Sequence, residues 1–180
     1  KQSLGEYRAN FLAGNLRKLG TKVTFDNFVV CPGNREAFDS CTAITHPTCN
    51  MASPLFLHGP VACGKTHLLC AIGQELIHRG RRIHFTPCNL LVQELLIAKR
   101  DLKLARVLKK YARYEALIID DIGYVQQSRE EMEVLFTLLA DRYERSSIMI
   151  SSNLPFSQWE QIFKDPMTTA AAIDRLVHHS

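Results

Sequence analysis

Short apolar runs alternate along the chain with longer segments of helical character. The runs lie at 55–58, 82–86, 116–119 and 147–151, and an extended segment at 23–30 precedes them. Segments expected to be helical lie at 4–19, 34–44, 65–78, 89–100, 101–111 and 128–145, with a last helix beginning at Asp165-Pro166. This repeated order of strand and helix predicts an α/β fold with a parallel sheet.

Polar residues and glycines are expected to define the ends of these helices. Gly20 and Gly80 follow two of them as stop signals. N-caps are expected at Asn34, Asn89, Asp101 and Asp165, and capping boxes at Ser128 with Glu131 and at Ser157 with Glu160.

The composition is that of an ordinary globular chain. With 180 residues, of which 46% are hydrophobic and 22% charged, one domain with a sizeable core is expected. Nothing approaches the roughly 18 apolar residues that span a bilayer, and the first residues lack a secretory signal. A cytoplasmic protein without membrane contact is therefore expected. The six cysteines form no C-x-x-C pair and are read as packing residues, and the seven histidines form no metal-binding pattern.

The strongest chemical signal follows the apolar run at 55–58. Residues 59–66 fit the P-loop pattern G-x-x-x-x-G-K-[ST] between a strand and a helix, as the motif requires. Backbone N–H groups of such a loop converge on phosphates, Lys65 would meet the β- and γ-phosphates, and the Thr66 hydroxyl would hold Mg²⁺. Ala62 and Cys63 stand where many P-loops carry a further glycine. The predicted phosphate-binding residues are Gly59, Pro60, Val61, Ala62, Cys63, Gly64, Lys65 and Thr66.

Two carboxylates follow the apolar run at 116–119. This is the Walker B arrangement, in which Asp120 would bind Mg²⁺ and Asp121 would polarise the attacking water. An acidic pair after a strand is otherwise a common loop cap, but it gains weight because it follows a P-loop. Asn153 follows shortly after the run at 147–151, behind Ser151-Ser152, and could orient the same water. Taken alone it would be a turn residue before Leu154-Pro155.

These motifs together resemble the IstB-type transposition ATPases, relatives of the DnaC helicase loader and the DnaA initiator. The resemblance rests on 59–68, 117–124, 142–145, 151–159 (Ser-Ser-Asn-Leu-Pro-Phe-Ser-Gln-Trp) and 174–179 (Asp-Arg-Leu-Val-His-His). It implies an AAA+ core over residues 23–180 behind a helical segment at 1–22, with a five-stranded parallel sheet flanked by helices and a lid that is absent or minimal. It also implies that the Asn153 strand lies between the P-loop and Walker B strands.

The same resemblance extends to further site residues. The segment Thr24–Val30 is similar to one that helps DnaA hold adenine, which implies a nucleotide contact from Phe28. His67, which directly follows the P-loop pattern, is also expected to contact the nucleotide. Arg175 is similar to an arginine that reaches the γ-phosphate of a neighbouring protomer, so ATP would bridge subunits of an oligomer. Without the resemblance, a surface salt bridge from Arg175 to a nearby carboxylate, such as Asp174 or its neighbours, would be the simpler interpretation.

A basic cluster lies between the second and third apolar runs. It comprises Lys99, Arg100, Lys103, Arg106, Lys109, Lys110 and Arg113, against a single acidic residue, Asp101. On one helix, four of these lysines and arginines would form a stripe suited to a phosphate backbone, so duplex DNA is the expected ligand. A solvated helix face is the alternative. Tyr111 and Tyr114 could stack on bases but are expected in the core.

Three functions remain open at this point. The first is a Mg²⁺-dependent ATPase that oligomerises on DNA and assists a transposase in choosing its target. The second is a DnaC- or DnaA-like helicase loader or replication initiator. The third is a DNA-binding adaptor that binds nucleotide without hydrolysing it.

Overall fold

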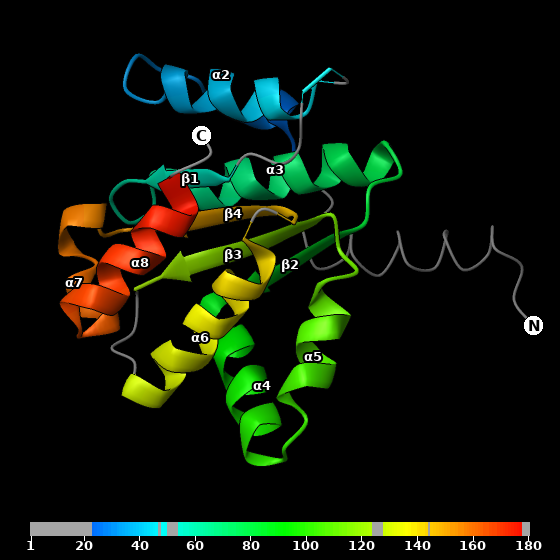
Figure 1. Ribbon diagram of the computed structural model, residues 1–180. Helices are drawn as coiled ribbons and strands as arrows, with labels where there is room; N and C mark the ends of the chain where they lie inside the picture. The colour runs from blue at the N-terminus through cyan, green and yellow to red at the C-terminus, as the bar shows by residue number, and fades with distance from the viewer. Residues whose placement is uncertain (1–22, 47, 50–53, 124–127, 144, 178–180) are drawn as a thin grey trace, which may run out of the picture.

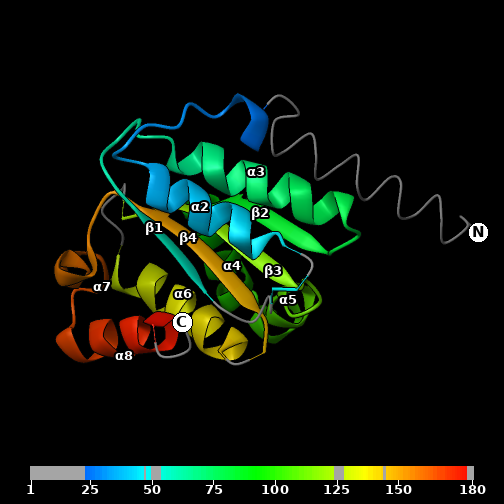
Figure 2. The same cartoon turned by 90° about the horizontal axis from the view of Figure 1, so that it is seen from above.

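A parallel sheet of four strands forms the centre of the computed structural model (Figures 1 and 2). The structure describes residues 23–46, 48–49, 54–123, 128–143 and 145–177. The sheet order is β1-β4-β3-β2, with β1 (Leu55–His58), β4 (Ser147–Ser152), β3 (Ala116–Ile122) and β2 (Ile83–Pro87). The expected position of the Asn153 strand, between the P-loop and Walker B strands, is confirmed.

The expectation of a fifth strand is wrong for the described residues. The segment at 23–30 contains a short 3₁₀ helix, η1 (Phe25–Asn27). The Thr24 N–H donates to Asn27 Oδ1 at 3.0 Å, and the Thr24 carbonyl lies 2.9 Å from His67 Nε2. Side chains therefore occupy backbone groups that a strand ladder would need.

Helices cover both faces of the sheet (Figures 1 and 2). One face carries α2 (Arg35–Ile44) and α3 (Lys65–His78). The opposite face carries α4 (Cys88–Arg100), α5 (Leu104–Tyr111), α6 (Arg129–Arg142) and α8 (Pro166–Val177), with η2 (Phe156–Gln158) and α7 (Glu160–Phe163) beside them. None of the described helices is long and apolar enough to cross a membrane.

The burial of β3 explains why its sequence is a continuous apolar run. Ala116 and Ile118 pack in the core under α2 and α3, whereas Leu117 and Ile119 pack in the core under α4 and α6. All four side chains are fully buried. Alternate residues of a strand face opposite sides, so a strand covered on both faces must be apolar at every position.

Some predicted helix ends are confirmed. Ser128 and Glu131 form the capping box of α6, and Asp165 Oδ2 accepts from the Thr168 N–H at 2.7 Å in the first turn of α8. The box predicted at Ser157 and Glu160 is wrong, because the chain forms η2 and then the four-residue α7 there.

Other predicted ends are shifted. Asn34 precedes α2, but its Oδ1 accepts from the Cys31 N–H at 2.7 Å instead of capping the helix. The helix predicted from Asn89 begins at Cys88, and Asp101 ends α4 instead of starting α5. The helix at 4–19 and His178-His179 lie outside the described residues.

A buried arginine ends α6 at 142, before the predicted end near 145. The Arg142 guanidinium donates to the carbonyls of Tyr111, Tyr114 and Ser147 at 2.7–3.1 Å. Burial lowers its pKa to about 10. These three hydrogen bonds tie α6 to the end of α5 and the start of β4, so Arg142 stabilises the scaffold at the amino-terminal end of β4.

Candidate nucleotide-binding site

The loop between β1 and α3 follows the path of a P-loop. Gly64 has φ +94° directly before α3, a conformation that side chains rarely adopt. A Cβ there would also meet the Phe28 ring at 2.8 Å. Ala62 has φ +61°, so the position where many P-loops carry glycine takes a left-handed conformation here at a cost of about 1–2 kcal/mol.

The Lys65 ammonium is held by the loop itself. Lys65 Nζ donates to the carbonyls of Gly59 at 2.8 Å and Pro60 at 2.7 Å, and it lies 3.7 Å from Cys63 Sγ. The residue is only 8% exposed. Its charge is therefore positioned at the mouth of the loop by neutral acceptors, which an anionic ligand could replace with stronger, charge-assisted hydrogen bonds.

A hydrogen-bonded chain links the P-loop helix to the ends of β3 and β4. The Thr66 hydroxyl lies 3.0 and 3.2 Å from the two carboxylate oxygens of Asp120. The Ser151 hydroxyl donates to Asp120 Oδ1 at 2.6 Å and accepts from the Asp121 N–H at 2.8 Å. Asp120 is thus oriented by two hydroxyl donors, one from each neighbouring element.

A break in the β3–β4 ladder directs Asp121 toward the cavity. The strand register shifts between Ile119 and Ile122, and Asp121 has φ +59°. Partial burial, followed by the negative charge of Asp120, raises the pKa of the Asp121 carboxyl, and Lys65 opposes this shift. A carboxylate whose pKa is raised is a stronger proton acceptor, which suits a general base.

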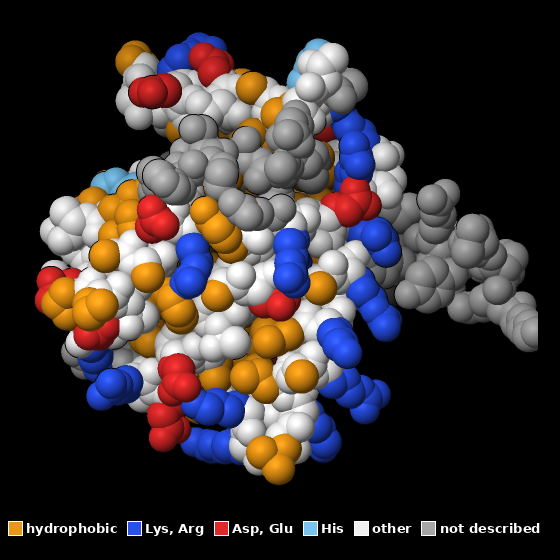
Figure 3. Space-filling model, in the orientation of Figure 1, with side chains coloured by type: hydrophobic (Ala, Val, Ile, Leu, Met, Phe, Trp, Pro, Cys, Tyr) orange, Lys and Arg blue, Asp and Glu red, His pale blue; other side chains and the backbone are white. Residues whose placement is uncertain are grey.

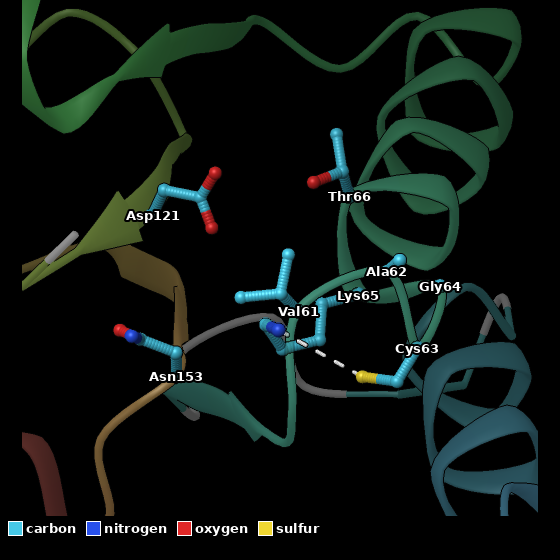
Figure 4. A pocket seen from close by; sticks show the side chains of 8 residues that line it. All are labelled: Val61, Ala62, Cys63, Gly64, Lys65, Thr66, Asp121 and Asn153. Atoms are coloured by element: carbon cyan, nitrogen blue, oxygen red, sulfur yellow. Dashed lines mark hydrogen bonds between the residues drawn. The ribbon is translucent and has the colours of Figure 1, made fainter.

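Residues 61–66 of the loop and α3, together with Asp121 and Asn153, line a cavity of about 250 Å³ (Figure 4). Asp121 and Asn153 lie along the sheet edge, and the loop with Thr66 at the start of α3 forms the other side. Asn153 Oδ1 is buried and has no hydrogen-bond partner among the described residues. A buried acceptor without a donor is uncommon, so this atom is suited to accept from a bound water or ligand.

Phe28 and His67 lie together beside the P-loop. Their ring centroids are 5.1 Å apart, and Phe28 also stacks on Phe38 of α2 at 5.7 Å. His67 is held by the Thr24 carbonyl and by Asn27 Oδ1, 3.1 Å away. The structure therefore joins the two residues at the back of Gly64, but neither lines the cavity of Figure 4. Their contact with a nucleotide stays a prediction.

Arg175 lies outside this cavity, on α8. Its guanidinium carbon is 4.4 Å from the centroid of the Phe136 ring of α6. Arg175 makes no ion pair with a described carboxylate, and its Nη1 is buried without a hydrogen-bond partner among the described residues. The salt bridge to Asp174 is therefore not formed, and the arginine is instead held by stacking on an aromatic face.

The basic cluster is divided between two helices, so the prediction of one continuous stripe is wrong. Residues 101–103 separate α4 from α5, because Leu102 takes φ +58°. Three of the lysines, here called the paired cations, form ion pairs at 2.7–3.1 Å: Lys99 with Glu133, Lys103 with Asp101 and Lys110 with Glu94. The remaining four, here called the unpaired cations, are exposed and have no ion pair within the described residues: Arg100, Arg106, Lys109 and Arg113.

Several residues that the sequence analysis singled out lie in the core. Trp159 is fully buried and donates from Nε1 to the Leu154 carbonyl at 3.2 Å. Tyr111 is fully buried and donates to Glu94 Oε2 at 2.8 Å, which confirms its expected core position. Cys41, Cys70 and Cys88 are buried packing residues, and burial raises the pKa of the Cys70 thiol to about 11.

Sequence reasoning did not assign a role to Ser151. It recognised only that the strand before Asn153 ends in small polar residues. A hydroxyl in a buried, otherwise apolar strand was the available signal, since such a group needs hydrogen-bond partners inside the protein.

The fold and the site together define a P-loop nucleotide-binding domain of the AAA+ type. The chain belongs to the family of IstB-like ATP binding proteins, whose family model matches residues 43–180.

Relatives and solved structures agree with this assignment. An insertion sequence ATP-binding protein of Sinorhizobium fredii is 48% identical over 126 residues, which cover 70% of this chain and 42% of the relative. The IS21 ATP-binding protein of Pseudomonas aeruginosa is 40% identical over 126 residues, covering 70% and 48%. The chain thus spans about half the length of these relatives. The crystal structure of the DnaC helicase loader shares the fold, with a TM-score of 0.76 at 17% identity, covering 91% of this chain and 96% of that one.

Proposed function

We propose that the protein binds and hydrolyses ATP with Mg²⁺, assembles on duplex DNA as an ATP-bridged oligomer, and assists a transposase in choosing its target. The observation that carries the proposal is the convergence of Lys65, Thr66, Asp121 and Asn153 on one cavity, with Asp120 behind Thr66. The names of the insertion sequence relatives support the link to transposition.

The loop and α3 supply what a triphosphate needs. Loop N–H groups and the positive end of the α3 dipole favour phosphate oxygens. On binding, Lys65 would exchange its contacts with the Gly59 and Pro60 carbonyls for contacts with phosphate. Phe28 and His67, which pack behind Gly64, would contribute to holding the base.

Thr66 and Asp120 fit a magnesium site. Adjacent ligands of an octahedral Mg²⁺ with bonds near 2.1 Å lie about 3.0 Å apart. The Thr66 hydroxyl and the Asp120 oxygens are already separated by 3.0 and 3.2 Å. When bound, the ion supplies positive charge beside the phosphates.

Hydrolysis would use the two polar groups on the sheet edge. Asp121 accepts a proton from water, since its raised pKa makes it a better base than an ordinary aspartate. Asn153 Oδ1, a buried acceptor without a protein donor, orients the same water. The Asp121 N–H donates to the Ser151 hydroxyl, and this hydrogen bond keeps Asp121 in place.

Arg175 would act across a subunit boundary. It does not line the cavity of its own chain, and Phe136 holds its guanidinium on α8. A rigid guanidinium offered by a neighbouring subunit can both stabilise transition-state charge and sense the γ-phosphate.

The unpaired cations are the proposed DNA contacts. Lysines and arginines without carboxylate partners can neutralise phosphates without first breaking an ion pair, so we expect salt-sensitive binding with little sequence preference.

Co-sedimentation with duplex DNA tests the assembly. We expect wild-type protein to sediment with DNA in ATP and Mg²⁺ but much less in ADP. Lys65→Ala should lose this ATP dependence, whereas Lys164→Ala, which alters an exposed lysine outside the cavity, should keep it. Equal sedimentation in ATP, ADP and no nucleotide would contradict ATP-bridged assembly.

A second candidate keeps the same ATP-dependent assembly but engages a replicative helicase. Its support is a chromosomal replication initiator protein DnaA of Deinococcus radiodurans, which is 33% identical over 144 residues, covering 78% of this chain and 31% of the relative. A pull-down in ATP from matched solutions of purified transposase and purified replicative helicase separates the two. Capture of the transposase alone supports the proposal, and capture of the helicase alone supports the alternative.

A further inference from the structure

One apolar side chain projects from the turn between α4 and α5. Leu102 is 94% exposed, more than any other large apolar residue described, and it has φ +58°. Exposure forgoes the hydrophobic stabilisation of a leucine, and a left-handed backbone is strained for a bulky side chain. The position is therefore unfavourable for folding on both counts.

The turn itself does not require leucine. The Leu102 N–H donates to the Lys99 carbonyl at 3.1 Å, and the next N–H donates to the Ala98 carbonyl at 2.7 Å, which together form a Schellman motif. The same motif ends α3, where the left-handed residue is Gly80 with φ +77°. Glycine fits this position without strain, so the side chain of Leu102 is what distinguishes the α4–α5 turn.

Positive charge flanks this side chain. Arg100 lies two residues before it, and Arg106 lies in the first turn of α5. Lys103 follows it directly and is paired with Asp101, which stands directly before Leu102. Figure 3 shows apolar atoms at the tip of the α4–α5 pair with lysine and arginine side chains on both sides of them. Two of these cations, Arg100 and Arg106, belong to the unpaired set. An apolar tip between cations matches DNA, whose bases are apolar on their faces and flanked by phosphates.

We propose that Leu102 is a wedge that inserts between stacked base pairs of duplex DNA, while the flanking cations bind the phosphates on either side. The proposal rests on the DNA-binding function proposed above. Apolar side chains of this kind unstack and bend duplexes when neighbouring basic residues hold the backbone. The strain in the turn then has a function, because it keeps the wedge projecting from the surface.

The experiment measures unstacking and affinity separately. A short duplex with 2-aminopurine at several positions is titrated with protein, since the fluorescence of this base rises when it is unstacked. Leu102→Gly removes the wedge and relieves the positive φ. Leu102→Met keeps a long apolar side chain, and Met167→Ala removes a comparably exposed apolar residue, 82% exposed, from α8.

We expect wild type, Leu102→Met and Met167→Ala to raise the fluorescence. Leu102→Gly should lose the rise and bind about tenfold more weakly, from the lost burial of the leucine side chain. Its salt dependence should be unchanged, because no phosphate contact is removed. Its Tm should equal or exceed that of wild type, so misfolding cannot account for the loss.

Two results would overturn the wedge. The first is Leu102→Gly that binds and unstacks DNA as wild type does. The second is normal DNA behaviour of that variant with loss of transposase binding, which would make Leu102 a protein contact. Failure of the wild-type protein to bind any duplex would instead refute the DNA-binding function on which the wedge depends.

Discussion

Ser151→Ala tests whether Ser151 positions the Walker B carboxylates or only contributes to packing. The neighbouring Ser152 supplies a matched control variant, Ser152→Ala. Ser151 and Ser152 are both fully buried, and each hydroxyl makes two described hydrogen bonds. Those of Ser151 reach the Asp120 carboxylate and the Asp121 N–H. Those of Ser152 reach the Ile122 carbonyl at 2.9 Å and the Leu154 N–H at 3.0 Å.

The two variants should differ in both stability and activity. Loss of a hydrogen bond to a charged group costs about 1.5–3 kcal/mol, against about 0.5–1.5 kcal/mol for a neutral one. We expect Ser151→Ala to lower the free energy of unfolding by about 2–3 kcal/mol, and Tm by about 5–10 °C. Ser152→Ala should cost about 1–2 kcal/mol.

Phosphate release at saturating ATP, measured well below both Tm values, gives the decisive comparison. Ser151→Ala should slow the rate about 10- to 100-fold, since a small displacement of Asp121 disturbs the attack geometry. Ser152→Ala should stay near the wild-type rate. Equal rates for the two variants would refute the view that Ser151 positions the Walker B carboxylates.

The remaining predictions concern Asp121 as the general base, the paired and unpaired cations, and Arg175. The ATPase rate should fall with acidification in a range above the ordinary aspartate pKa of 3.8, because burial and Asp120 raise the pKa of Asp121. The same raised pKa means that the folded protein binds the Asp121 proton more tightly than the unfolded chain does. Asp121 therefore stabilises the fold below pH 3.8, and this contribution is lost as pH rises through the raised pKa. Urea unfolding of Asp121→Asn should lack this pH dependence. Alanine at each unpaired cation should lower the slope of log affinity for DNA against log salt by about 0.9. Alanine at each paired cation should lower it less, and equal effects would refute the distinction between paired and unpaired cations. Arg175→Ala should bind ATP normally but lose turnover, and turnover should return in mixed oligomers with Lys65→Ala. Mixed oligomers that stay inactive would contradict action of Arg175 across the subunit boundary.

Most of the candidate site could be predicted from the sequence, because its residues belong to short local motifs. A P-loop and a Walker B strand are each defined by a few adjacent residues whose chemistry demands one backbone path, so Lys65, Thr66 and Asp120 could be placed without the structure. Ser151 could not, because its role depends on the ladder break that brings the Asp121 N–H to its hydroxyl across two strands.

The errors arose where local rules were overridden. Asp101 is a good N-cap by type, but the Schellman motif after Ala98 makes it the end of α4, and leucine at the left-handed position concealed the motif. The segment Thr24–Val30 has strand-like composition, yet the Thr24 N–H donates to Asn27 Oδ1 and the Thr24 carbonyl is bound to His67, which holds the segment in a different path beside the P-loop. Neither the local turn nor the contact with the distant His67 is encoded in periodicity.

The most direct test of the account is phosphate release from ATP and Mg²⁺ by the purified protein, with and without duplex DNA, beside Lys65→Ala and Asp121→Asn. The site geometry predicts turnover by wild type, loss of ATP binding in Lys65→Ala, and retained ATP binding without turnover in Asp121→Asn. Wild-type protein that binds ATP but releases no phosphate under any DNA condition would contradict the ATPase and leave a nucleotide-dependent adaptor in its place.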